Sequence, residues 1–143
     1  MSGGVCSWQR WGPYPLLFAT AFLVSANTFG NGWTYDDFSV IVENSDVRSW
    51  AGFLKDSYPG RPLRELTYLL DHSLFGLNPF GRHIQQIFWH ALNACLIFTL
   101  GRQLQLARWA ALLAALIFVL YPLKVEVVAN LSRRKDSLAL AGF

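Results

Sequence analysis

The sequence predicts an all-α protein: a multipass transmembrane helical bundle with an amphipathic interfacial helix in its first long loop. Composition is the first reason, because 53% of the 143 residues are hydrophobic and only 15% are charged, whereas soluble domains carry about 25% charged residues. Pattern is the second reason, because the apolar residues gather in long runs that are typical of membrane helices. Aromatic residues make up 15% of the chain and would suit membrane interfaces.

The same features exclude other classes of protein. The net charge of +3 is diluted through apolar sequence, which gives no support to nucleic-acid binding. Two cysteines are too few for a disulfide scaffold, and no close Cys/His spacing predicts a zinc site. The chain has no repeat and no low-complexity run, so it is neither fibrous nor disordered.

Three apolar segments are predicted to span the membrane, over about 14–30, 84–100 and 106–123, and a fourth begins at 137–143. Seventeen residues of helix cover roughly 25 Å, which is borderline for a span. Because a helix broken off within lipid leaves backbone groups unsatisfied, residues 1–143 are expected to be the N-terminal part of a longer membrane domain. Residues 10–26 also fit a cleaved signal peptide, an alternative that remains open.

The loop over 31–83 is hydrophilic and contains seven of the nine acidic residues. Within it, residues 61–77 are predicted to form an amphipathic helix, because Pro62 suits a first turn and leucines recur at steps of three and four. The leucines of this stripe are Leu63, Leu66, Leu70, Leu74 and Leu77. Such a helix can lie flat at a lipid boundary, and packing on a soluble loop domain is the alternative.

An acidic pair, Asp36 and Asp37, follows the first apolar segment. Either carboxylate could cap a short helix over 38–42. The pair could instead act as a general base or a metal ligand, since carboxylates held among aromatic residues are suited to such roles.

The second apolar segment has polar residues at steps of three, four and three, which places them on one helix face. This polar membrane face consists of His83, Gln86, His90 and Asn93. Hydrogen bonding between helices explains such a face better than catalysis does. The third segment carries a stripe of small residues that would allow close helix packing, at Ala107, Ala110, Ala111, Ala114 and Ala115.

Several motifs together are more specific than any of them alone. They are Asp36-Asp37, Arg61-Pro62-Leu63, Leu66-Thr67-Tyr68, Asp71-His72, the run from Leu74 to Gly81, His83, His90 to Asn93, Tyr121 to Glu126, and Arg134-Lys135-Asp136. From Trp33 to Phe143 the chain resembles the transmembrane and tetratricopeptide-repeat proteins, relatives of the protein O-mannosyltransferases. It departs from that family at Tyr121, where His is usual, and at Val125, where Thr is usual.

The resemblance implies the multipass GT-C glycosyltransferase fold, of which this chain would be the N-terminal part. It implies transfer of a sugar, for example mannose, from a polyprenyl-phosphate carrier to a protein hydroxyl at the extracytoplasmic membrane face. The expected partners are therefore this donor, a protein acceptor and the lipid bilayer, in a bacterial inner membrane or the endoplasmic reticulum membrane. Counting basic residues places the 31–83 loop in the cytoplasm instead.

Under this resemblance Asp36 and Asp37 are the expected catalytic residues, one as the base and the other orienting it or helping to bind a metal. Arg61, Arg64, Arg133 and Arg134 are expected to bind the lipid phosphate, because guanidinium matches phosphate geometry. No cofactor is identified, and a divalent metal is compatible with the chemistry. The fragment alone is expected to be inactive. A non-catalytic membrane scaffold or assembly subunit is the alternative function, and a transporter fragment is a third.

Overall fold

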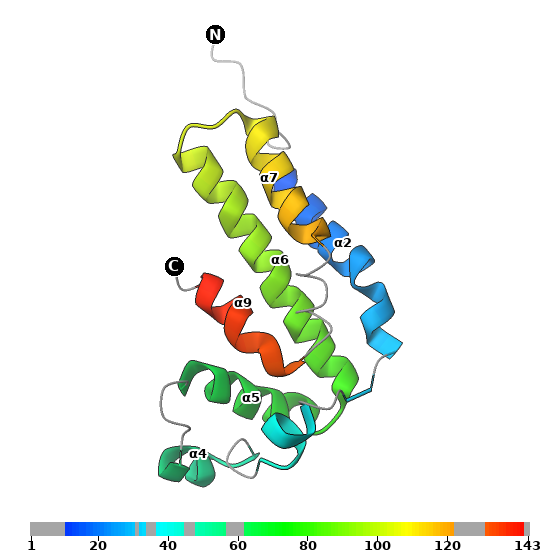
Figure 1. Ribbon diagram of the computed structural model, residues 1–143, viewed down its shortest axis with the longest axis vertical. Helices are drawn as coiled ribbons and strands as arrows, with labels where there is room; N and C mark the ends of the chain where they lie inside the picture. Colours follow the sequence, from blue (N-terminus) through cyan, green and yellow to red (C-terminus); the bar gives the residue numbers. More distant parts are fainter. Residues whose placement is uncertain are drawn as a thin grey trace.

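The computed structural model describes residues 11–30, 32–33, 37–44, 48–56, 62–121 and 131–141, and every regular element within them is a helix. Figure 1 shows their arrangement. In chain order they are α2 (Pro13–Val24), the 3₁₀ helix η1 (Ala26–Gly30), the π-helical turn η2 (Phe38–Val42), α4 (Trp50–Asp56), α5 (Pro62–Phe75), α6 (Pro79–Gln103), α7 (Arg108–Leu120), the 3₁₀ turn η4 (Leu131–Arg133) and α9 (Arg134–Ala141).

Helix α6 is the longest of the described helices, and α2, α5, α7 and α9 pack against it (Figure 1). It begins where Pro79 takes the first helical position and the side chain of Asn78 accepts a hydrogen bond from the Phe80 amide, a typical N-terminal cap. After α6 the chain turns through Gln105, which has a φ of 62°. Helix α7 ends at Leu120, and Tyr121 is extended, as expected for a residue before proline.

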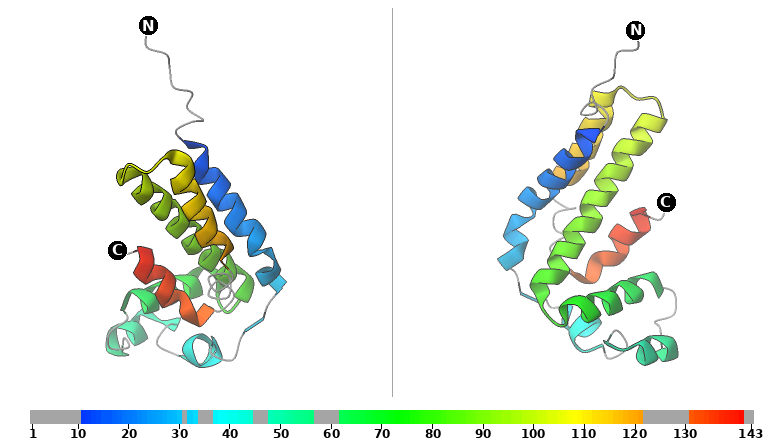
Figure 2. Two further views of the ribbon diagram at one scale, coloured as in Figure 1. Left: turned by 45° about the horizontal axis from the view of Figure 1, so that its top comes forward. Right: turned by 180° about the vertical axis from the view of Figure 1, so that it is seen from behind.

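The upper part of the molecule is a bundle of α2, α6 and α7 around an apolar core (Figures 1 and 2). Small residues let α6 and α7 approach closely, because Ala111 and Ala115 are buried against α6. These are two members of the small-residue stripe, whereas Ala107 and Ala114 are exposed. The buried core residues are Leu17, Ala21, Ile87, Ala91, Ala94, Cys95, Phe98, Ala111, Ala115 and Val119.

The lower part is a second layer, in which α5 crosses below the bundle and α4 lies beneath α5 (Figures 1 and 2). Helix α9 runs beside the lower half of α6 and also contacts α5. A small core joins these elements, formed by Ile41, Tyr68 and Leu131 with Trp33 packed against it. Segments far apart in the sequence therefore meet at the first turns of α6 and α9.

The predicted multipass transmembrane bundle is wrong, and so is the predicted membrane localisation: none of the described helices is both long enough and apolar enough to cross a membrane. Helices α2 and α7 contain 12 and 13 residues, or roughly 18–20 Å of rise, whereas a bilayer core is about 30 Å thick. Helix α6 has 25 residues, but they include Arg82, His83 and Gln86. The placement of the 61–77 helix at a lipid boundary, which was part of the same prediction, is therefore also wrong.

We predict that Gly101→Ala destabilises the protein, although alanine normally favours a helix by about 1 kcal/mol over glycine. The added methyl would lie 2.9 Å from Cβ of Ala111 and 3.4 Å from its Cα, so α6 and α7 would have to separate. We expect the free energy of unfolding, measured with urea, to fall by about 1–3 kcal/mol. The double variant Gly101→Ala/Ala111→Gly removes the clash and should show favourable coupling; strictly additive effects would contradict this close contact.

Candidate functional site

Helix α5 is the amphipathic helix predicted over 61–77, but it is oriented with its polar side inward. The leucine stripe faces outward: Leu63 is 70% exposed and Leu74 is 71% exposed. The opposite face is buried and carries charge. The first members of the charged cluster lie on this buried face. They are Arg64, Glu65, Tyr68 and Asp71.

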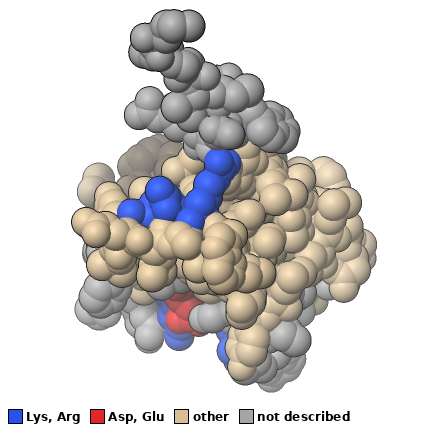
Figure 3. All heavy atoms as spheres, turned by 90° about the horizontal axis from the view of Figure 1, so that it is seen from above, with Lys and Arg blue, Asp and Glu red and all other residues tan. Residues whose placement is uncertain are grey.

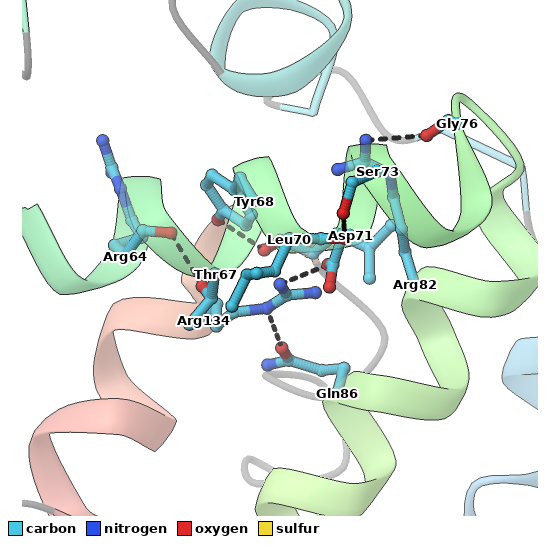
Figure 4. Close-up of polar contacts among 11 residues, drawn as sticks. Arg64, Thr67, Tyr68, Leu70, Asp71, Ser73, Gly76, Arg82, Gln86 and Arg134 are labelled. Atoms are coloured by element: carbon cyan, nitrogen blue, oxygen red, sulfur yellow. Dashed lines mark hydrogen bonds and ion pairs between the residues drawn. The ribbon is translucent and has the colours of Figure 1, made fainter. Parts of the chain in front are cut away.

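A buried ion pair between Asp71 and Arg134 lies at the centre of this cluster (Figure 4). Arg134 Nη1 donates to Asp71 Oδ2, and Arg134 Nε donates to Gln86 Oε1 at 3.2 Å. Neither Asp71 nor Arg134 is exposed to solvent. Burial raises the pKa of Asp71, and the positive charge of Arg134 acts against that rise. Because its partners come from α5 and α6, Arg134 ties the start of α9 to both helices.

Tyr68 is the aromatic residue that packs against the charged cluster. The guanidinium carbon of Arg134 lies 4.9 Å from its ring centroid, within the range of a cation–π contact. The hydroxyl of Tyr68 donates a 2.8 Å hydrogen bond to the carbonyl of Leu131, at the start of η4. Burial raises the pKa of Tyr68 to about 12, although the positive charges of Arg134 and Arg64 act in the other direction.

Arg82, in the first turns of α6, is a further member of the cluster and was not among the sequence-predicted site residues. Its side chain is fully buried, with Nη2 donating to the carbonyl of Gly76 at 2.9 Å (Figure 4). The ring of Trp33 lies 5.6 Å from its guanidinium carbon. Burial lowers the pKa of Arg82, and the carboxylate of Asp71 opposes this effect. One sequence feature could have identified Arg82: it lies four residues before Gln86, on the polar face of α6.

Of the predicted catalytic pair, Asp36 lies outside the described residues and Asp37 is fully buried. Asp37 precedes η2, but its side chain makes no capping hydrogen bond with that turn. Its charge acts on both Tyr68 and Arg82. Asp37 is therefore electrostatically part of the charged cluster, although it is 34 positions from Asp71 in the sequence.

The four arginines predicted to bind a phosphate have different surroundings. Arg61 lies outside the described residues, and Arg133 is exposed. Arg64 is buried and donates to the carboxylate of its neighbour Glu65 at 3.0 Å. Of the three that the structure describes, Arg134 alone belongs to the centre of the charged cluster.

The predicted polar face of α6 is buried, and two of its four side chains contact α9. Gln86 Nε2 lies 3.4 Å from Ser137 Oγ, and Asn93 Nδ2 donates to the carbonyl of Ser137 at 2.9 Å. His90 turns toward α7, where its Nε2 lies 3.5 Å from the carbonyl of Val119. His83 is also fully buried. These side chains join α6 to its neighbouring helices.

Within the described part of the chain, no three His, Cys, Asp or Glu side chains are grouped so that they could hold a metal ion. A cavity of about 640 Å³ lies instead at the opposite end of the molecule, between α2 and α7, with Leu16, Trp109, Leu112 and Arg108 among its lining residues. Figure 3 shows that end as a largely uncharged surface crossed by basic side chains. The cavity is far from the charged cluster. We take the charged cluster as the candidate functional site because it contains predicted site residues, Asp37 and Arg134 among them.

We predict that Asp71→Asn lowers the free energy of unfolding by about 3–5 kcal/mol, because it leaves the buried Arg134 without its counter-charge. Asp136→Asn is the matched control, since it makes the same chemical change at an exposed position in the first turn of α9. It should cost less than about 1 kcal/mol. Urea denaturation followed by circular dichroism measures both values, and equal losses would contradict a structural role for the Asp71–Arg134 pair.

We predict that Tyr68 makes stability depend on pH between 10 and 12. Its pKa is raised in the folded protein, so the unfolded chain loses this proton first and stability falls as the pH rises from about 10 to about 12. The loss from this group should approach about 3 kcal/mol. Tyr68→Phe should abolish that part of the decline, although it also lowers stability at neutral pH by about 1–3 kcal/mol.

Tyr121→Phe is the control for this pH dependence, because Tyr121 is 49% exposed. It should keep the wild-type decline in urea-unfolding free energy across the same pH range. A Tyr68→Phe protein that declines as steeply as the wild type would contradict the assignment.

The chain is similar in sequence to several protein O-mannosyl-transferases. It is 32% identical over 133 residues to protein O-mannosyl-transferase Tmtc1 of Drosophila melanogaster and 31% identical over 153 residues to TMTC1 of Homo sapiens, alignments that cover 82% and 94% of this chain. Protein O-mannosyl-transferase TMTC2 of Homo sapiens is 27% identical over 125 residues, covering 77% of this chain. The chain spans only 15–17% of the length of these relatives.

No protein-family model and no solved structure matches the chain significantly. The relationship to the GT-C superfamily and the assignment as an N-terminal part stay predictions. The similarity over most of the chain supports a relationship to the TMTC protein O-mannosyl-transferases, as its motifs predicted.

Proposed function

We propose that this chain is part of a glycosyltransferase that transfers a sugar, with mannose as the candidate, from a polyprenyl-phosphate carrier to a protein hydroxyl. The observation that carries the proposal is its similarity, over most of its length, to proteins named protein O-mannosyl-transferases. Because the chain spans about a sixth of those proteins, the activity is proposed for a longer protein that contains it.

The reaction would need a base at the acceptor hydroxyl and positive charge at the leaving phosphate. The acceptor oxygen would bond to the anomeric carbon as the bond from that carbon to the phosphate oxygen breaks. The hydroxyl proton would pass to a carboxylate, and the phosphate would leave with the bonding electrons. We assign the base to Asp37, with Asp36 orienting it, because Asp37 is buried beside a cluster that contains arginines.

A non-catalytic scaffold or assembly subunit is the second candidate. Two arginines of the cluster are engaged with carboxylates of the chain itself, Arg134 with Asp71 and Arg64 with Glu65. Ion pairs of this kind can serve to hold helices together without any chemistry. The two candidates differ in whether Asp37 is needed for sugar transfer or only for folding.

We predict that Asp37→Asn, made in a protein that contains this chain and has the length of its relatives, lowers sugar transfer at least 100-fold, because general-base catalysis typically contributes 10²–10⁴ in rate. Asp36→Asn should also lower it. Transfer is measured with a labelled polyprenyl-phosphate sugar and a protein acceptor, with each variant at matched protein level. Glu43→Gln, at an exposed acid just after η2, is the control and should keep wild-type activity. Unchanged transfer in both Asp variants would remove them from the mechanism and favour the scaffold.

A further inference from the structure

We propose that the cavity between α2 and α7 binds a long-chain carboxylate, with the alkyl chain inside the cavity and the carboxylate at Arg108. The cavity lies at the opposite end of the molecule from the charged cluster, so this site is separate from the proposed sugar transfer. Its described lining includes none of the residues that the sequence predicted as site residues.

The cavity has the size and the lining of a site for an apolar ligand. Its volume of about 640 Å³ lies within the range of about 300–1,000 Å³ that is usual for ligand pockets. Apart from Arg108, its described lining consists of glycine, proline, leucine and tryptophan residues. These walls favour an alkyl chain, because burial of apolar surface is favourable in proportion to its area. A sugar would lose hydrogen bonds to water that such side chains mostly do not replace.

The cavity is open to the outside of the molecule. Two of its lining residues are exposed, Leu16 by 48% and Trp109 by 68%. A ligand can therefore enter between α2 and α7 without unfolding of the bundle.

The upper end of the molecule has positive charge but no acidic side chain from its own helices. All nine acidic residues of the sequence fall within 36–71 or 126–136, so α2, α6 and α7 contain none. Figure 3 shows basic side chains on this end. Arg108 is half-buried and lines the cavity. Charge complementarity therefore favours an anion from outside the chain at Arg108.

The position of Arg108 in α7 strengthens this argument. Arg108 is the first residue of the helix, where the positive end of the helix dipole disfavours a cation. The first turn of α7 contains no acidic residue, and Ala107 at the N-cap provides no side-chain hydrogen bond. A ligand carboxylate beside Arg108 would offset both the side-chain charge and the helix dipole.

A single arginine favours a ligand with one negative charge. A guanidinium and a carboxylate can form two parallel hydrogen bonds, and the pair is then neutral. A phosphate monoester has a charge of about −1.5 to −2 at pH 7 and would need a second cation. Arg102, at the end of α6, is already engaged, because its Nη1 donates to the carbonyl of Leu106 at 2.6 Å. A neutral alcohol would leave Arg108 uncompensated.

The test is competition photolabelling of the purified 143-residue chain, kept in a neutral detergent with a steroid tail so that no detergent alkyl chain competes. The probe is a palmitate analogue with a diazirine on its chain, and labelled peptides are identified by mass spectrometry. The competitors are palmitate, hexadecanol and hexadecyl phosphate. We expect saturable labelling of α2 and α7. Palmitate should displace the probe at concentrations at least tenfold lower than the other two competitors, because it alone matches the single charge of Arg108.

Arg108→Gln should raise the palmitate concentration needed for displacement at least tenfold, because it removes charge-assisted hydrogen bonds. The hexadecanol concentration should change by less than about twofold, which separates lost recognition of the carboxylate from damage to the cavity. Arg102→Gln is the matched control, since it makes the same change at an exposed arginine outside the described lining. It should leave both concentrations within about twofold of the wild type.

Leu16→Trp tests the cavity itself, because the larger side chain would occupy the space of the alkyl chain. It should abolish saturable labelling of α2 and α7. Leu23→Trp is its matched control, since it makes the same change on the same helix at a position that is 76% exposed and outside the described lining. Labelling in that variant should equal that of the wild type.

Equal weakening by Arg108→Gln and Arg102→Gln, or equal displacement by palmitate and hexadecanol, would overturn the assignment of a carboxylate to Arg108. Tighter binding of hexadecyl phosphate than of palmitate would overturn the choice of head group. Labelling that does not saturate, or that falls outside α2 and α7, would overturn the cavity as the site. The comparison of head groups uses the unmodified chain, so it decides the question even if Arg108→Gln does not fold.

Discussion

The buried ion pair between Asp71 and Arg134 is the constraint on which the lower half of the molecule depends. A charge without solvent must have a partner, because the penalty for an isolated buried ion exceeds what packing returns. Pairing Asp71 with Arg134 brings the start of α9 against α5 and α6. The polar face of α5 is therefore buried and its leucines point outward, which reverses the usual arrangement of an amphipathic helix.

Helix α6 serves two kinds of interface along its length. Its upper half packs small and apolar residues against α2 and α7, where Gly101 allows close approach to Ala111. Its lower half buries polar side chains that bond to α9, to α7 and to Arg134. A dry interface tolerates many apolar sequences of similar volume, whereas the polar one requires specific partners. The candidate functional residues lie in that polar half.

The relationship to the TMTC protein O-mannosyl-transferases gives the charged cluster a chemical context. Sugar transfer from a phosphate carrier needs a carboxylate and positive charge close together, and Asp37 and Arg82 fall within electrostatic reach of one another. Burial strengthens such interactions because the surrounding dielectric is low. The same burial explains why Tyr68, which walls the cluster, resists ionisation.

Local sequence alone determined the helical class, the helix near 61–77 and the polar face of α6, because these features depend on spacings of three and four residues. The three membrane spans were not borne out, because composition reports apolarity but not where each helix ends. Tertiary structure alone decided which face of α5 is buried and that Arg82 lies with Arg134. Those outcomes rest on contacts between distant positions, such as Asp71 with Arg134, 63 residues apart. No local pattern encodes which buried charge will meet which, because pairing follows from how the helices pack.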